Sequence, residues 1–195
     1  MSPRTSEPLQ QFGTSLHQLI LDLPERDAIT DTLDYLLGAL YGLSRAQELE
    51  FRDRATGQIQ SYSAYLANDA LAIAKGQPIN QPWLAGFYFN SSIQRLASAF
   101  DRIPRMLGAK METTTAENGQ QTKKRRTTTK ERMAEVNPEN HVQWTLLYDE
   151  VNDFKHEPEG RTAGRGVTMA DALAAYDQTI ALLKKSAPSL KARYK

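Results

Sequence analysis

The chain has 195 residues, with 24 Lys and Arg, 23 Asp and Glu, a net charge of +1 and no cysteine. This length suits a single domain, and the missing thiols exclude disulfides, cysteine-ligated metals and cysteine nucleophiles. No apolar run approaches the roughly 20 residues that a membrane span requires, and residues 1–11 lack a signal-peptide core. We therefore expect a cytoplasmic protein that no segment anchors in a membrane.

Apolar residues recur at helical spacing along most of the chain, and no segment alternates as a half-buried strand does. The pattern predicts six helices with mostly short connections, which is typical of an up-and-down bundle. We expect one all-α domain spanning residues 1–195. The predicted helices are, approximately, 9–23, 27–55, 59–75, 80–108, 138–157 and 168–187.

Proline and capping residues mark several of the predicted ends. Pro104 should kink or shorten the fourth helix, because proline removes a helical hydrogen bond. Asn137 followed by Pro138 is a typical start for the fifth helix. Thr168 and Asp171 form a capping-box pattern at the start of the sixth.

A basic, threonine-rich segment lies between the fourth and fifth helices. Residues 113–129 contain few apolar side chains, so burial cannot offset the entropy of ordering them, and we expect a mobile loop at about 110–136. Residues 119–132 carry a net charge of +5, which leaves −4 for the rest of the chain. The basic residues are Lys123, Lys124, Arg125, Arg126, Lys130 and Arg132.

This basic loop is a candidate nucleic-acid site. A flexible cationic segment attracts the phosphates of RNA or DNA without reading the base sequence. No aromatic residue is interleaved with the basic ones, so base stacking is not expected there. The alternative interpretation is a solvated charge run that contributes only to solubility.

The fifth predicted helix carries polar residues on one face, at spacings of seven, four and four. They are His141, Tyr148, Asn152 and His156. The run Asn152-Asp-Phe-Lys-His156, soon followed by proline and glycine, resembles the signature of HEPN-like helical domains. The segment from Tyr88-Phe-Asn90 to Arg95 on the fourth helix is similar to the partner helix of bacterial relatives.

The resemblance implies a compact helical bundle that is often a homodimer. Many such domains are RNases of toxin–antitoxin, CRISPR or other defence systems, and others only bind. Their active motif is an Arg, usually a polar residue, a short spacer and a His. Asn152 and His156 match the polar residue and the His, whereas Val151 stands where the Arg is expected. Arg95 or Arg102 could supply a cation if the fourth and fifth helices pack together.

Two further patterns are candidate binding sites. Asp153-x-x-His156 is half of a di-iron pattern, but the chain offers no second pair, so we predict no metal site and no cofactor. Arg161 and Arg165 lie in a glycine-rich segment before the last helix, where a helix N-terminus could help to hold an anion. A flexible connector is the alternative for that segment.

The sequence thus favours a HEPN-like, non-catalytic bundle that contacts nucleic acid or a protein partner, with a role in bacterial defence implied by the resemblance alone. One alternative is a metal-independent endoribonuclease in which His156 accepts the proton of the 2′-hydroxyl, with Asn152 beside it and Arg95 as a helper. The other is a purely structural protein-interaction bundle.

Overall fold

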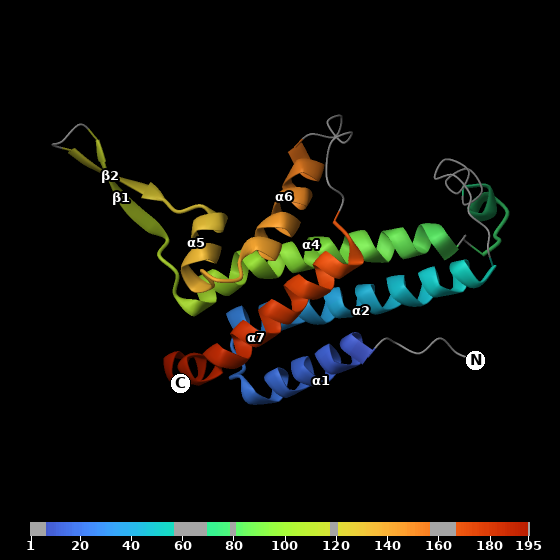
Figure 1. Cartoon of the computed structure of the whole chain (residues 1–195), viewed down its shortest axis with the longest axis horizontal. Coiled ribbons are helices and arrows are strands. Elements are labelled where there is room, and N and C mark those ends of the chain that lie inside the picture. The colour runs from blue at the N-terminus through green and yellow to red at the C-terminus, as the bar shows by residue number, and fades with distance from the viewer. Residues whose placement is uncertain (1–6, 57–69, 79–80, 118–120, 157–166, 195) are drawn as a thin grey trace.

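The computed structural model describes residues 7–56, 70–78, 81–117, 121–156 and 167–194. In this part of the chain the molecule is an all-α helical bundle, as predicted, and it carries one small hairpin that was not predicted (Figure 1). The strands are β1 (Glu112–Glu117) and β2 (Gln121–Arg126). The helices are α1 (Glu7–Asp22), α2 (Asp27–Thr56), α4 (Gln81–Leu107), α5 (Thr129–Val136), α6 (Val142–His156) and α7 (Met169–Arg193).

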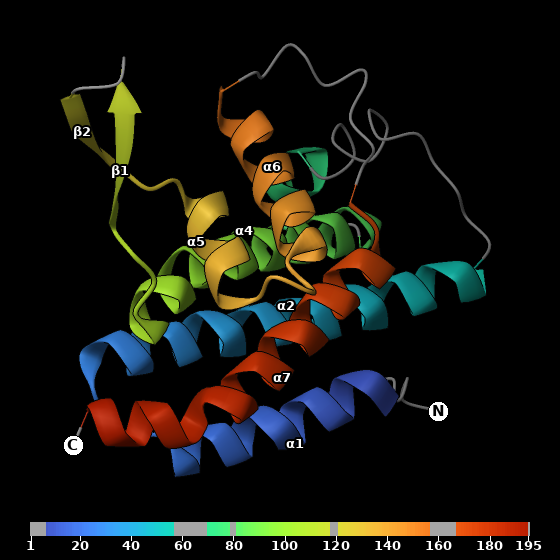
Figure 2. The ribbon, with the colours of Figure 1, turned by 60° about the vertical axis from the view of Figure 1, so that its left-hand side comes forward.

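The bundle is built on an antiparallel pair of long helices, α2 and α4, which run side by side along the molecule (Figure 1). Helices α1 and α7 cover one side of this pair, and α6 leans across α4. The hairpin and α6 both extend from the side of the bundle opposite α1 (Figure 2). None of the described helices is both long enough and apolar enough to cross a membrane.

The close approach of α2 and α4 depends on two glycines, four residues apart on α2. A Cβ atom on Gly42 would lie 2.1 Å from the Ser92 hydroxyl oxygen and 2.8 Å from the Tyr88 carbonyl oxygen. One on Gly38 would lie 2.5 Å from a guanidinium nitrogen of Arg95. Glycine is therefore needed at position 42, because the backbone of α4 lies where a side chain would be, whereas at position 38 the flexible end of the Arg95 side chain could move.

One contiguous core joins the helices. The rings of Phe100 on α4 and Trp144 on α6 stack with their centroids 5.1 Å apart. The buried Tyr176 hydroxyl donates to the Leu36 carbonyl 3.1 Å away, which satisfies its hydrogen bond, and burial raises the pKa of this phenol above its usual value. The largest fully buried side chains come from six helices: Leu16, Ile29, Leu36, Leu43, Leu96, Phe100, Ile103, Met133, Trp144, Leu147, Tyr176 and Leu183.

The prediction of a loop at 110–136 is wrong, because this segment forms β1, β2 and α5. The threonines of β1 are β-branched and suit an extended chain, even where no apolar face is buried. Thr128 and Glu131 form a capping box that starts α5, so Asn137 caps the C-terminus of that helix instead of starting the next. Helix α6 consequently begins at Val142.

Two prolines lie inside helices where an end or a kink was predicted. Pro104 lies within α4, and α7 continues past Pro188 to Arg193. The last turn of α7 is held by burial of Leu190 and by the Tyr194 hydroxyl, which donates to the Met106 carbonyl at 3.3 Å. Tertiary packing therefore outweighs the hydrogen bond that proline removes. The capping box of Thr168 and Asp171 is confirmed. Of the predicted helix 59–75, residues 70–74 are helical and 59–69 lie outside the described residues.

Two glycine-to-alanine substitutions test the packing of α2 on α4. Gly42→Ala should lower the free energy of unfolding by about 2 kcal/mol, because the new methyl group collides with Ser92 and the Tyr88 backbone. Gly86→Ala in α4 is the matched control, since nothing lies within 4 Å of its added Cβ. It should raise stability by up to about 1 kcal/mol. Urea denaturation measures both, and equal effects would contradict the packing described.

Candidate functional site

The hairpin is a narrow antiparallel ribbon that projects from one end of the bundle (Figures 1 and 2). Its register places Glu112 opposite Arg126 and Thr113 opposite Arg125. Strands β1 and β2 pair only with each other in the described part of the chain. An isolated two-stranded ribbon is marginally stable in water, so its base must be held by the bundle.

A buried arginine holds the base of the ribbon to α4. The side chain of Arg132 on α5 is 4% exposed, and it contacts Asp101 of α4 at 3.2 Å. It also donates to the Thr127 carbonyl at 2.5 Å and to the Thr129 hydroxyl at 2.9 Å. The Thr129 hydroxyl in turn donates to Asp101 at 2.8 Å. A buried guanidinium requires such partners, because an unpaired charge would be costly to bury.

Two more hydrogen bonds close the ribbon where it leaves the bundle. The Thr127 backbone amide donates to the Met111 carbonyl at 3.0 Å, and its hydroxyl donates to the Lys110 carbonyl at 2.6 Å. Thr127 therefore continues the pairing of the strands into the turn that enters α5. These hydrogen bonds and the contacts of Arg132 with Asp101 join the base of the ribbon to α5 and to α4.

Arg132 was predicted to bind nucleic acid, and that prediction is wrong because its charge is buried against Asp101. Two other predicted cations are also engaged within the protein. Lys130 pairs with Asp149 of α6 at 2.6 Å, and Arg125 pairs with Glu131. The sequence could not show these pairings, because Asp101 and Asp149 lie in other helices.

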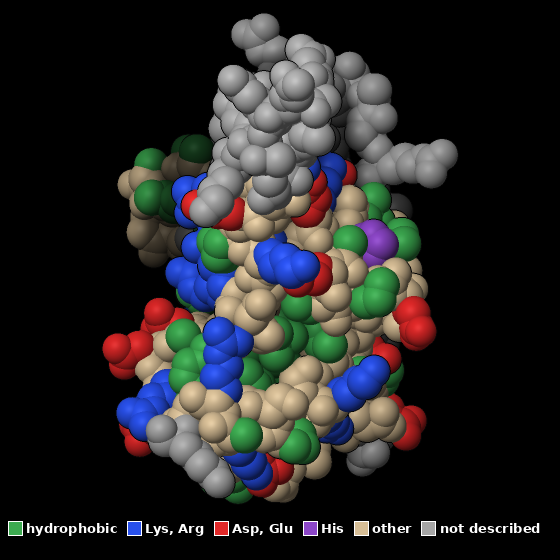
Figure 3. Space-filling model, turned by 90° about the vertical axis from the view of Figure 1, so that its left-hand side faces the viewer, with side chains coloured by type: hydrophobic (Ala, Val, Ile, Leu, Met, Phe, Trp, Pro, Cys, Tyr) green, Lys and Arg blue, Asp and Glu red, His purple; other side chains and the backbone are tan. Residues whose placement is uncertain are grey.

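The remaining basic residues of the ribbon lie in β2. Arg126 is exposed and has no salt bridge within the described residues. Lys123 and Lys124 pair with Thr115 and Thr114 across the ribbon, although their side chains lie outside the described residues. Figure 3 views the molecule from the end that bears the ribbon and shows basic and acidic side chains mixed over the bundle. Besides Arg126, β2 contains Lys123 and Lys124 in its sequence, so three basic residues of the segment without a described ion pair belong to this strand.

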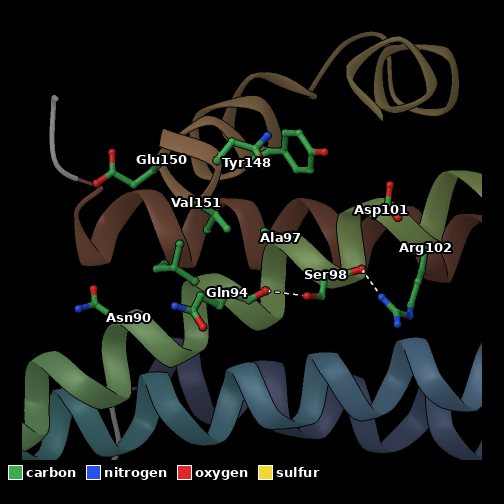
Figure 4. Close-up of a pocket in the computed structure, with 11 residues that line it drawn as sticks. Asn90, Gln94, Ala97, Ser98, Asp101, Arg102, Tyr148, Glu150 and Val151 are labelled. Atoms are coloured by element: carbon green, nitrogen blue, oxygen red, sulfur yellow. Dashed lines mark hydrogen bonds between the residues drawn. The ribbon is translucent and has the colours of Figure 1, made fainter. Parts of the chain in front are cut away.

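A second candidate site is a groove of about 460 Å³ between α4 and α6 (Figure 4). Its floor is apolar and its walls are polar. Asp101 lies both in the groove and in the anchor of the ribbon, so the two sites adjoin. The lining residues are Asn90, Ile93, Gln94, Ala97, Ser98, Asp101, Arg102, Tyr148, Glu150, Val151 and Asn152.

The structure brings together only some of the residues of the HEPN-like motif. Asn152 lines the groove together with Asn90 of α4. Arg95 packs over Gly38 of α2 and does not line this groove. The Arg102 guanidinium lies 4.3 Å above the Tyr35 ring and donates to its hydroxyl at 3.4 Å, so it also packs on α2.

Other predicted site residues lie outside the described structure. The backbone of His156 ends α6, but its side chain is not described. Arg161 and Arg165 lie in the undescribed segment 157–166. Gln94, Ser98 and Glu150 also line the groove and were not predicted from the sequence. The spacing of Asn90, Gln94 and Ser98 by four could have revealed a polar stripe beside the apolar face of α4.

Comparisons with protein-family models, with curated proteins and with solved structures gave no match for this chain.

Removing the ion pair between Arg132 and Asp101 should lower the free energy of unfolding much more than removing the exposed pair between Lys130 and Asp149. Asp101→Asn leaves the buried Arg132 without its counter-charge, and we expect a loss of about 2–3 kcal/mol, because Asp101 itself is partly exposed. Asp149→Asn removes the exposed pair with Lys130 and should cost less than about 1 kcal/mol. Urea denaturation compares them, and equal losses would contradict the anchoring role.

Glu131 should titrate well below an ordinary glutamate. Its hydrogen bond to Arg125 and that to the Thr128 backbone lower its pKa from 4.5 to about 2. A carboxylate whose pKa is lowered in the folded state stabilises the fold above its unfolded pKa. That stabilisation is lost as the pH falls from about 4.5 through about 2. NMR titration of the carboxyl carbon measures this pKa, and Arg125→Ala should raise it. An unchanged pKa in that variant would show that the pair is absent in solution.

Proposed function

We propose that this protein is a HEPN-like, non-catalytic helical bundle whose β-ribbon contacts the phosphate backbone of nucleic acid. The observation that carries the proposal is the clustering of basic residues in β2, on a ribbon that projects from the bundle. Lysine and arginine bind phosphates through charge and hydrogen bonds, and they release counterions when they do so. A defence setting is what the HEPN-like resemblance adds to this proposal.

The arrangement around α6 favours contact over cleavage. Cleavage through the 2′-hydroxyl needs a base such as His156 and a cation beside the phosphate. Val151 stands at the position of the motif arginine, and it lies in the groove. The guanidinium groups of Arg95 and Arg102 pack on α2. Arg102 also lines the groove, so an endoribonuclease would need this guanidinium to leave Tyr35, or a cation from another part of the chain.

The proposal predicts binding that depends on β2. A variant with Lys123, Lys124 and Arg126 changed to alanine should bind labelled single-stranded RNA at least tenfold more weakly at low salt, because phosphate contacts dominate such binding. The matched control changes three exposed lysines elsewhere, Lys75, Lys184 and Lys185, to alanine. Fluorescence anisotropy measures the RNA affinity of the parent and of both variants, and the two variants lose the same number of positive charges.

Two outcomes would contradict the proposal. Equal weakening in the ribbon and control variants would mean that net charge alone drives binding, and no binding at low salt would exclude nucleic acid as the partner.

A cleavage assay tests the alternative function, in which the same RNA is incubated with the parent and with His156→Ala. Cleavage by the parent alone would replace the proposal with an endoribonuclease.

A further inference from the structure

The groove between α4 and α6 has a regular geometry. On α4, Asn90, Gln94 and Ser98 follow one another at four-residue intervals, which is about 6 Å per step along a helix. On α6, Tyr148 and Asn152 have the same spacing. Figure 4 shows the labelled residues of α4 and those of α6 on opposite sides of the groove. The two walls therefore present polar groups with a common repeat.

The floor of the groove differs from its walls. Ile93 and Ala97 are buried apolar residues of α4, and Val151 of α6 is half-buried beside them. This floor can take apolar side chains of a ligand, because it removes their surface from water. A ligand that fits must therefore be polar along its edges and apolar at intervals.

The polar groups of the walls are available for a ligand. The side-chain amides of Asn90, Gln94 and Asn152 have no hydrogen-bond partner among the residues that the structure describes. Each amide offers an N–H donor and a carbonyl acceptor. A main-chain peptide group offers the complementary pair.

We propose that this groove binds an extended peptide segment that carries a basic residue. Residues two apart in an extended chain are about 6.6 Å apart, which matches the roughly 6 Å step of the amides. The distance from Asn90 to Asp101 along α4 is about 16 Å, so the groove accommodates about five extended residues. Alternate side chains of the peptide enter the apolar floor.

The charge in the groove selects a basic peptide. Asp101 is engaged by Arg132 and Arg105, and Arg102 lies on Tyr35. Glu150 has no ion-pair partner among the described residues, so its carboxylate is free to pair with a lysine or arginine of the peptide. This carboxylate would repel a phosphate backbone, and the Arg102 guanidinium, which also lines the groove, is held against the Tyr35 ring. The groove and the ribbon therefore bind different partners, and this inference does not depend on the proposed function.

Selection from a random library of eight-residue peptides, displayed against the full chain, tests the inference. Enriched peptides should contain lysine or arginine, and their affinities are measured by fluorescence anisotropy. Gln94→Trp places an indole in the groove and should weaken binding at least tenfold. Gln18→Trp on α1, also at an exposed helical position, is the matched control and should leave affinity unchanged. Circular dichroism verifies that both variants fold.

Two chemical changes test the mode of binding. Glu150→Gln should weaken binding of the basic peptide but not of the same peptide with its basic residue replaced by norleucine. N-methylation of the main-chain amides that enter the groove should also weaken binding, because it removes their donors. The inference is overturned if no peptide is enriched, if enriched peptides bind Gln94→Trp as tightly as the parent, or if a single-stranded oligonucleotide displaces them from the groove.

Discussion

The ion pair between the buried Arg132 and the partly exposed Asp101 is the interaction on which the candidate sites depend. It joins α5 to α4 at the base of the ribbon, and Thr129 completes it by bonding to both side chains. A guanidinium in this position is tolerated only when it is paired and hydrogen-bonded. The pair therefore fixes where the ribbon leaves the bundle, and through Asp101 it also forms one end of the groove between α4 and α6.

This constraint changes how the basic segment is understood. Arg132 is buried and paired with Asp101, so its charge is not available to a phosphate. Arg125 and Lys130 are paired on the surface, where such pairs contribute little stability and are screened by salt. Three of the six basic residues are therefore engaged within the protein, and the other three, Lys123, Lys124 and Arg126, belong to β2. The groove differs from the ribbon, because its Glu150 carboxylate has no ion-pair partner among the described residues, whereas its Arg102 guanidinium packs on Tyr35.

Helical periodicity was enough to predict the all-α class and most helices, because burial of apolar stripes such as Ile93, Leu96 and Phe100 determines those elements. It failed for the ribbon, because the sequences of β1 and β2 have no apolar alternation. It also failed at Pro188, where packing of a later turn decides the helix end. The pairing of Arg132 with Asp101 depends on residues 31 positions apart, so only the folded chain reveals it. Asn152 could be predicted as a site residue from its motif. That Asn90 and Gln94 lie in the same groove depends on how α4 and α6 pack, which the sequence does not show.

The salt dependence of nucleic-acid binding tests the central claim most directly. For single strands, the logarithm of the binding constant falls with the logarithm of salt concentration by about 0.7 per phosphate contacted. Because Arg125, Lys130 and Arg132 are engaged within the protein, at most three of the six basic residues contact phosphates, which predicts a slope no steeper than about −2. A slope near −4 would mean that all six contact phosphates, and a slope of zero that none does; either would contradict this account.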